Sequence, residues 1–111
     1  MPIKQIHYEV VKGEKRWTYE LKLTLNKRKI IAVTITDYYQ TKSGRAMITN
    51  ELIIKLLKKL NGKRLRISKI VDNRKIYKWE TTSKNQSYRL FFWLKDHTTD
   101  HLWIRNIHPI D

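Results

Sequence analysis

Two segments near the C-terminus alternate aromatic and basic side chains. Arg89, Phe91 and Trp93 occupy every second position of one segment, and Trp103 and Arg105 do so in the next. Every second residue of a strand points to the same face, so these five side chains share a face if the residues between them face a core. Aromatic rings stack on nucleic-acid bases and cations neutralise phosphates. The pattern therefore favours a single-stranded nucleic-acid surface; the alternative is a sheet covered on both faces, with Phe91 and Trp93 in a core.

The basic residues that could contact phosphates are concentrated upstream of these segments. The chain has 24 Lys and Arg against 10 Asp and Glu, a net charge of +14. Residues 55–78 contain ten of the basic residues and one acidic residue, Asp72, which is a net +9. So dense a charge repels itself, and a polyanionic partner would relieve the repulsion. The alternative is a solvated helix face followed by an edge strand that lysines protect.

From the basic block and the aromatic positions we predict a set of nucleic-acid contacts. These are Lys63, Arg64, Arg66, Lys69, Arg74, Lys75, Lys78, Trp79, Trp93 and Trp103.

Groups that could transfer protons are few. His108 follows Arg105 near the end of the chain and could act as an acid or base near neutral pH, although a lone surface histidine is the commoner role. His97 and His101 are spaced like metal ligands on a helix, but their segment is a predicted turn, so we expect no metal. The chain lacks cysteine, a Ser-His-Asp order and a phosphate-binding glycine loop. Ordinary metabolic enzymes are poor candidates, and we expect no cofactor.

The elements that must position these residues follow from the periodicity of apolar residues. Apolar residues at every second position predict strands around residues 5–10, 17–25, 31–35, 65–67, 77–79, 88–94 and 102–104. Ile53, Leu56, Leu57 and Leu60 follow the spacing of a helix face and predict one amphipathic helix over about 50–61. The order is three strands, one helix and four strands. Hairpin-length connections then predict an α+β fold whose mainly antiparallel sheet carries the helix.

The length and composition limit the wider organisation. A chain of 111 residues fits a single domain spanning 1–111, and its 41% hydrophobic content argues against disorder. No apolar run approaches the ~20 residues that cross a bilayer, and the N-terminus lacks the apolar region of a signal peptide. We therefore expect a cytoplasmic protein that does not enter a membrane. Its oligomeric state stays open, although an exposed edge strand could pair with a second copy.

The segment from Asn50 to His108 resembles the C-terminal half of the RelE/ParE/HigB toxin superfamily. The resemblance lies in a helix followed by four strands, with Ser87-Tyr88-Arg89-Leu90-Phe91-Phe92-Trp93 before the terminal strand 101–108. It implies a metal-independent ribonuclease that cleaves messenger RNA and is held by an acidic antitoxin. It also implies that Arg89 contacts the scissile phosphate, with Arg105 or His108 as its partner and Lys75 and Lys78 in support.

A second segment is similar to single-stranded DNA-binding coactivators of the PC4/Whirly type. It runs from Lys29 to Leu60, a strand ending in Asp37-Tyr38-Tyr39 followed by a loop and an amphipathic helix. We therefore expect one of three functions: a ribonuclease-type toxin using Arg89, Arg105 and His108, a non-catalytic DNA- or RNA-binding module, or a protein that docks an acidic partner. Nucleic acid is the expected partner, with RNA favoured over DNA.

Overall fold

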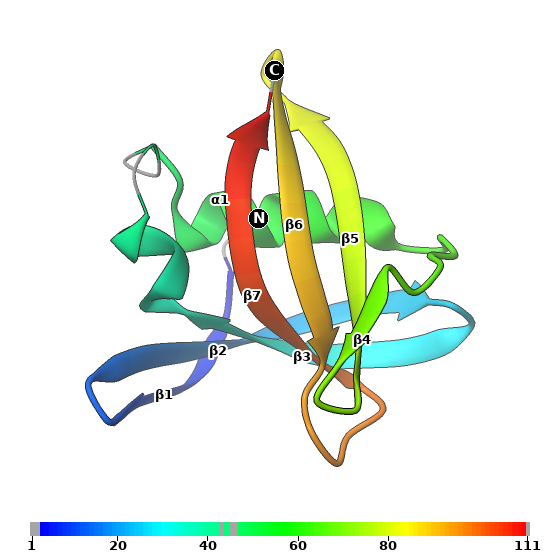
Figure 1. Cartoon of the computed structure of the whole chain (residues 1–111), viewed down its shortest axis with the longest axis horizontal. Coiled ribbons are helices and arrows are strands. Elements are labelled where there is room, and N and C mark those ends of the chain that lie inside the picture. Colours follow the sequence, from blue (N-terminus) through cyan, green and yellow to red (C-terminus); the bar gives the residue numbers. More distant parts are fainter. Residues whose placement is uncertain (1–2, 43, 45–46, 111) are drawn as a thin grey trace.

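A computed structural model describes residues 3–42, 44 and 47–110. In this part of the chain seven strands form one sheet in the order β1-β2-β3-β7-β6-β5-β4. They are β1 (Gln5–Val11), β2 (Glu14–Leu25), β3 (Arg28–Thr36), β4 (Lys69–Val71), β5 (Arg74–Ser83), β6 (Gln86–Leu94) and β7 (His101–Ile110). The sheet is strongly twisted, so that β1, β2 and β3 cross steeply below β5, β6 and β7 (Figure 1).

The predicted α+β class with a mainly antiparallel sheet is wrong. Strands make up 58% of the described residues, and the sheet is mixed because β7 inserts between β3 and β6 and runs parallel to β3. The parallel register runs from Ala32 opposite His101 to Ile35 opposite Ile104. Short connections predict the pairing of consecutive strands, and nothing in apolar periodicity shows which strands far apart in the chain will meet.

One amphipathic helix, α1 (Asn50–Leu57), packs across one face of β5, β6 and β7 (Figure 1). Thr49 caps its start, because its side chain accepts a hydrogen bond of 3.1 Å from the amide of Leu52. The α-helix ends before the predicted residue 61 and continues as a 3₁₀ turn, η2 (Lys58–Leu60), which Gly62 terminates at φ 81°.

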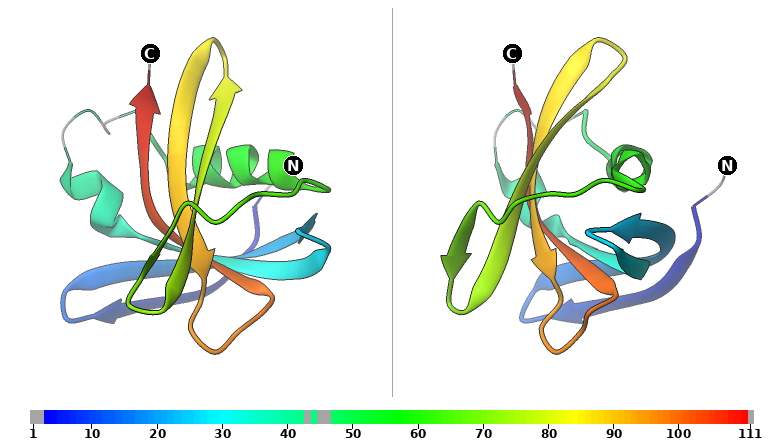
Figure 2. Two further views of the ribbon diagram at one scale, coloured as in Figure 1. Left: turned by 45° about the vertical axis from the view of Figure 1, so that its right-hand side comes forward. Right: turned by 90° about the vertical axis from the view of Figure 1, so that its right-hand side faces the viewer.

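The hydrophobic core lies between this helix and the sheet. Its fully buried members from the sheet include Val33, Ile35, Leu90, Phe92 and Ile107, all at 0% exposure. A second 3₁₀ turn, η1 (Asp37–Thr41), follows β3 and leads toward the helix. The hairpin of β4 and β5 projects on the side away from α1 (Figure 2). The strands β5, β6 and β7 therefore have one face covered by α1 and a second face that lies beside the β4–β5 hairpin. Among the described residues, no helix has the length and apolar character needed to cross a bilayer.

Several hairpins turn through two residues that both have positive φ, as type I′ turns require. One is Asn26-Lys27, with φ 52° and 64°. Lysine is strained in this region, and Asn-Gly is the favoured pair, so we expect Lys27→Gly to raise the free energy of unfolding by about 0.5–1 kcal/mol. Urea unfolding monitored by tryptophan fluorescence measures the change. Lys29→Gly is the matched control: it removes an exposed lysine from strand β3 and should lower stability, so equal effects of the two changes would contradict the prediction.

Candidate active site

The sheet face opposite α1 aligns side chains in rows across β5, β6 and β7. In one row Glu80 lies opposite Arg89, and Arg89 lies opposite His108. In the next row Phe91 lies between Lys78 and Asn106. Side chains directly opposite each other in neighbouring strands have Cβ atoms about 4.5–5.5 Å apart. The first row therefore places a carboxylate, a guanidinium and an imidazole side by side. We call Glu80, Arg89 and His108, which are candidates for catalysis, the catalytic row.

The catalytic row is held by contacts within the sheet face. Arg89 donates from Nε to Oε2 of Glu80 at 2.6 Å, and its Nη2 lies 2.5 Å from the same oxygen. The ring of His108 stacks on Phe91 with centroids 6.0 Å apart. Glu80 is exposed, whereas Arg89 and His108 are partly buried, so all three are on the surface or close to it. The arrangement offers a proton acceptor, a phosphate ligand and a proton donor on one open face.

A hollow of about 810 Å³ lies further along the same face. We call it the aromatic hollow, because Phe91, Trp93, Trp103 and Tyr38 line it. Trp93 lies directly opposite Trp103 in the pairing of β6 with β7. Phe91 belongs both to this hollow and to the stack with His108, so the hollow begins next to the catalytic row.

Three rings of the aromatic hollow are covered by arginines from other elements. The guanidinium carbon of Arg16 lies 5.1 Å from the ring centre of Trp103, and that of Arg74 lies 5.0 Å from Trp93. The contact of Arg105 with Tyr38 is closer, at 3.8 Å. A hydrogen bond from Lys42 and the charges of Arg105 and Lys42 lower the pKa of the Tyr38 phenol. Flat cationic groups already occupy the ring faces on which bases would stack.

A β-bulge gives the hollow one of its walls. The register of β6 and β7 shifts between Phe91, which faces Asn106, and Phe92, which faces Ile104. Arg105 is the extra residue, and both Arg105 and Asn106 line the hollow. Bulges commonly redirect a side chain in this way. Of the three residues predicted to be catalytic, Arg89 and His108 are therefore neighbours, while Arg105 is turned toward η1.

The residues predicted to contact nucleic acid fall into separate places. Lys69, Arg74, Trp93 and Trp103 line the aromatic hollow, although Trp93 is only 8% exposed beneath Arg74. Lys78 is exposed beside the catalytic row, and Lys75 lines a second hollow. Trp79 faces the other way, because it pairs with Leu90 in the core and is 8% exposed. The three remaining residues are exposed in the connection between η2 and β4: Lys63, Arg64 and Arg66.

Local sequence patterns do not single out four residues that lie on this face or line its hollow: Arg16, Tyr38, Glu80 and Asn106. Glu80 lies on the same strand face as Lys78. That it pairs with Arg89 depends on the register of β5 with β6, which apolar periodicity does not give. Arg16 and Tyr38 reach the aromatic hollow because β7 lies beside β3, and Asn106 does so because of the bulge. Each case depends on strand pairing and not on local pattern.

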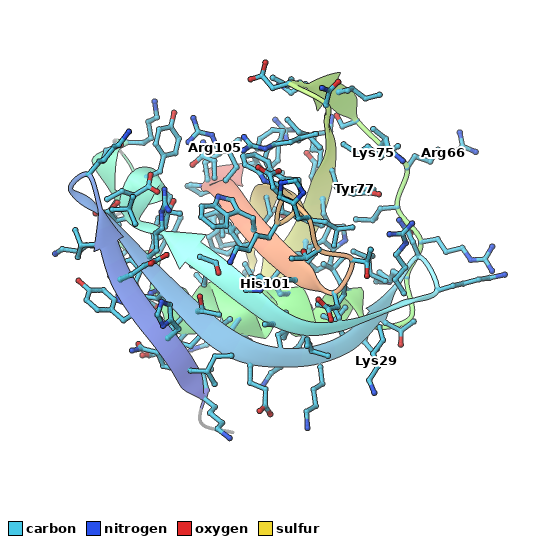
Figure 3. The ribbon with its side chains drawn as sticks, turned by 90° about the horizontal axis from the view of Figure 1, so that it is seen from below. Lys29, Arg66, Lys75, Tyr77, His101 and Arg105 are labelled. Carbon is cyan, nitrogen blue, oxygen red and sulfur yellow. The ribbon has the colours of Figure 1, made fainter. Side chains whose placement is uncertain are left out.

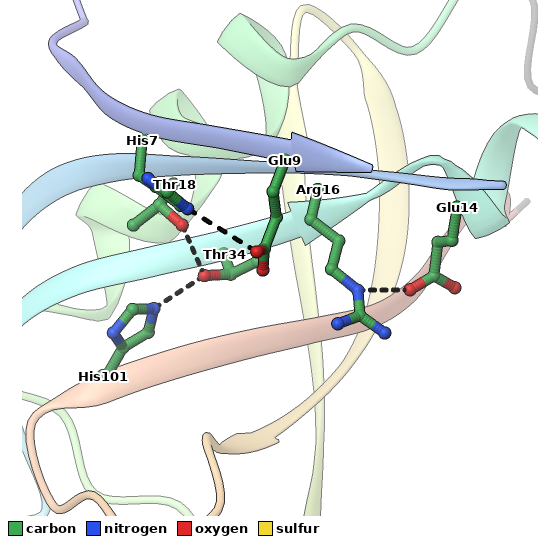
Figure 4. A network of polar contacts seen from close by, with 7 residues as sticks. All are labelled: His7, Glu9, Glu14, Arg16, Thr18, Thr34 and His101. Carbon is green, nitrogen blue, oxygen red and sulfur yellow. Dashed lines mark hydrogen bonds and ion pairs between the residues drawn. The ribbon is translucent and has the colours of Figure 1, made fainter. Parts of the chain in front are cut away.

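Beyond the aromatic hollow, hydrogen bonds connect polar side chains on β2, β3 and β7 (Figure 4). The hydroxyls of Thr18 and Thr34 are 2.8 Å apart, and Thr34 Oγ1 is 2.7 Å from Nε2 of His101. Burial lowers the pKa of His101 from its ordinary value of 6.5, Lys95 lowers it further, and Asp100 opposes the change. The neutral imidazole is thus the form that fits the fold.

Stability should consequently fall in acid through His101. A lowered folded-state pKa means that this contribution is complete above about pH 6.5 and is lost as the pH falls below it. We expect the wild-type protein to lose more stability between about pH 7.5 and pH 5.5 than His101→Gln does. Urea midpoints at the two pH values measure this difference. His7→Gln, which removes an exposed histidine from β1, is the control and should behave as wild type; identical pH dependence in all three proteins would refute the assignment.

No protein-family model, curated protein or solved structure matches this chain. Among residues 3–42, 44 and 47–110, no three His, Asp or Glu side chains are grouped to hold a metal ion. The function is therefore inferred from the arrangement of the catalytic row and its surroundings.

Proposed function

We propose that this protein is a metal-independent endoribonuclease that cleaves single-stranded RNA. The observation that carries the proposal is the catalytic row, in which Glu80, Arg89 and His108 lie opposite one another on three neighbouring strands. Cleavage of RNA without a metal needs a base for the 2′-hydroxyl, a cation for the phosphate and an acid for the leaving oxygen. The row contains one group of each kind.

The reaction assigned to the row is a transesterification. Glu80 removes the proton of the ribose 2′-hydroxyl, and the 2′-oxygen attacks the adjacent phosphorus. Arg89 stabilises the negative charge that develops on the phosphoryl oxygens. The bond from phosphorus to the 5′-oxygen breaks as protonated His108 gives its proton to that oxygen. The products are a 2′,3′-cyclic phosphate and a free 5′-hydroxyl. Glu80 then loses its acquired proton to water and His108 regains one from water, which restores both groups.

The surroundings of the row suit a polyanionic substrate. Lys78 is exposed in the next row, two residues from Glu80 on the same strand face. The net charge of +14 attracts a polyanion to the whole molecule. Arg105, beside Tyr38, is assigned to substrate binding and not to the chemical step.

The test is incubation of the purified protein with end-labelled single-stranded RNA in the presence of a chelator. We expect fragments that carry a 2′,3′-cyclic phosphate, and no cleavage of DNA of the same sequence. A single 2′-deoxy substitution should block cleavage at that position alone, because the attacking oxygen is missing. RNA that stays intact at high enzyme concentration, or DNA that is cut equally well, would refute the proposal.

A further inference from the structure

A second hollow, of about 420 Å³, lies at the end of the sheet next to the aromatic hollow. It is formed where the β2–β3 turn, the start of β5 and the loop after β6 meet. Arg74, Lys95 and Asp96 line both hollows. The two hollows are therefore contiguous, and the boundary between them is the ion pair of Arg74 with Asp96.

Two hydrogen bonds join the residues of this boundary. Arg74 donates from Nε to Oδ1 of Asp96 at 3.0 Å and from Nη2 to Oδ2 at 2.7 Å. The pairing lowers the pKa of the Asp96 carboxyl and raises the pKa of Arg74. Since Arg74 also lies over Trp93, one side chain joins the wall of the aromatic hollow to the rim of the second.

The rim of the second hollow is basic; we call it the basic hollow. Arg28, Lys75 and Lys95 come from three separate segments and are all exposed. None of the three forms an ion pair with another described residue. The one carboxylate of the rim, Asp96, is already neutralised by Arg74. Beneath the rim lie apolar side chains, including Tyr77 and Leu94.

Further cations are held at this end of the molecule by a backbone connection. The side chain of Asn26 accepts from the amide of Leu65 at 2.7 Å, and the amide of Asn26 donates to the carbonyl of Lys63 at 3.0 Å. The segment that carries Lys63, Arg64 and Arg66 is thereby tied to the β2–β3 turn. Figure 3 places Lys29, Arg66 and Lys75 along one side of the molecule, away from Arg105.

We propose that the two hollows are consecutive subsites for one single strand of nucleic acid. Unpaired bases stack on Trp103 and Tyr38 in the aromatic hollow, and Arg16 and Arg105, which cover these two rings, turn to the phosphates. The strand then crosses the Arg74–Asp96 pair, and its next phosphates contact Arg28, Lys75 and Lys95 in the basic hollow. In taking RNA as the natural ligand the inference rests on the proposed function, but it concerns binding and not cleavage.

The chemistry of the hollows favours a single strand over other polyanions. A duplex keeps its bases stacked on each other, so it cannot place them on the rings of the aromatic hollow. A free phosphate would use the cations of the rim but not the neighbouring rings. Only a flexible strand with alternating bases and phosphates matches both hollows in series.

The test uses oligothymidylate, which lacks the 2′-hydroxyl and so separates binding from cleavage. Competition binding is measured with strands of about four and about ten nucleotides, since sites of this kind cover roughly 4–16 nucleotides. We expect the longer strand to bind at least about tenfold more tightly, with a steeper dependence on salt, by about 0.7 in the log–log slope for each added phosphate contact. Arg28→Gln/Lys75→Gln should remove this gain and leave the binding of the short strand unchanged.

Matched variants make the outcomes distinct. Lys55→Gln/Lys84→Gln removes the same charge from exposed positions that line neither hollow, and should keep the gain with length. Equal affinity of the wild type for both lengths, or equal losses in the two double variants, would overturn the two-subsite inference. Neither result would bear on the proposed cleavage of RNA by the catalytic row, because oligothymidylate cannot be cleaved by this reaction. Conversely, a length gain that depends on Arg28 and Lys75 in a protein that leaves RNA intact would uphold the binding sites and refute the ribonuclease.

Discussion

Glu80→Gln is expected to slow the cleavage of single-stranded RNA by about 10²- to 10⁴-fold, the usual contribution of a general base. Glutamine keeps the size of the side chain and can still contact Arg89, but it cannot take the proton of the 2′-hydroxyl. Initial rates under single-turnover conditions measure the chemical step directly. Because the reaction needs one group deprotonated and one protonated, the wild-type rate should also fall at both ends of the pH range.

The control for this change is Glu51→Gln, which removes an exposed carboxylate from the first turn of α1, on the opposite side of the sheet. It should cleave RNA at the wild-type rate. Glu80 and Arg89 form an exposed pair, and such pairs contribute about 0–1 kcal/mol, so Glu80→Gln should unfold close to the wild-type midpoint. A Glu80→Gln protein that is folded and fully active would remove Glu80 from the mechanism.

Arg89→Ala is expected to lower the cleavage rate by about 10²- to 10³-fold, as the loss of one group that stabilises a developing oxyanion does elsewhere. Arg89 lies between Glu80 and His108 in the catalytic row. Its loss would remove the cation that stabilises the negative charge on the phosphoryl oxygens. Arg89→Lys should recover only part of the rate, because lysine lacks the planar fork of arginine. The measurement is again the single-turnover rate.

A cellular readout accompanies the arginine variant. Induced expression of the wild-type chain should arrest growth through loss of RNA, and Arg89→Ala should relieve the arrest at equal protein level. Lys55→Ala is the control, because this lysine is exposed on α1 and lines neither hollow. It should arrest growth like the wild type. Arrest that persists in Arg89→Ala would assign the effect to binding and not to cleavage.

Local patterns in the sequence correctly give local properties of the structure. Alternation in residues 88–94 separates Leu90 and Phe92, which are fully buried, from Phe91 and Trp93, which line the aromatic hollow. The helix begins at Asn50 as its cap and apolar spacing indicate. These features depend on residues that are close together in the sequence, so a single sequence is enough to predict them.

Properties that depend on pairing could not be read in the same way. In β5, basic residues occur on both sides of the alternation, so the sequence did not show that Trp79 faces the core and Glu80 the solvent. The bulge at Arg105 also shifts the alternation within β7, and this changes which side chains line the aromatic hollow. Register is set by the contacts of the whole sheet, and a shift of one residue reverses every side chain.

The position of β7 has a consequence for the order in which the molecule can form. It is the last of the described strands, yet it lies in the middle of the sheet between β3 and β6. During synthesis the hairpins on either side can form first, but each keeps one unpaired strand edge until residues 101–110 arrive. Such edges are prone to pair with other chains, and sheets built from distant segments fold slowly. The face of β5, β6 and β7 therefore becomes one surface only when residues 101–110 have paired, so the proposed cleavage of RNA would have to wait for the insertion of β7.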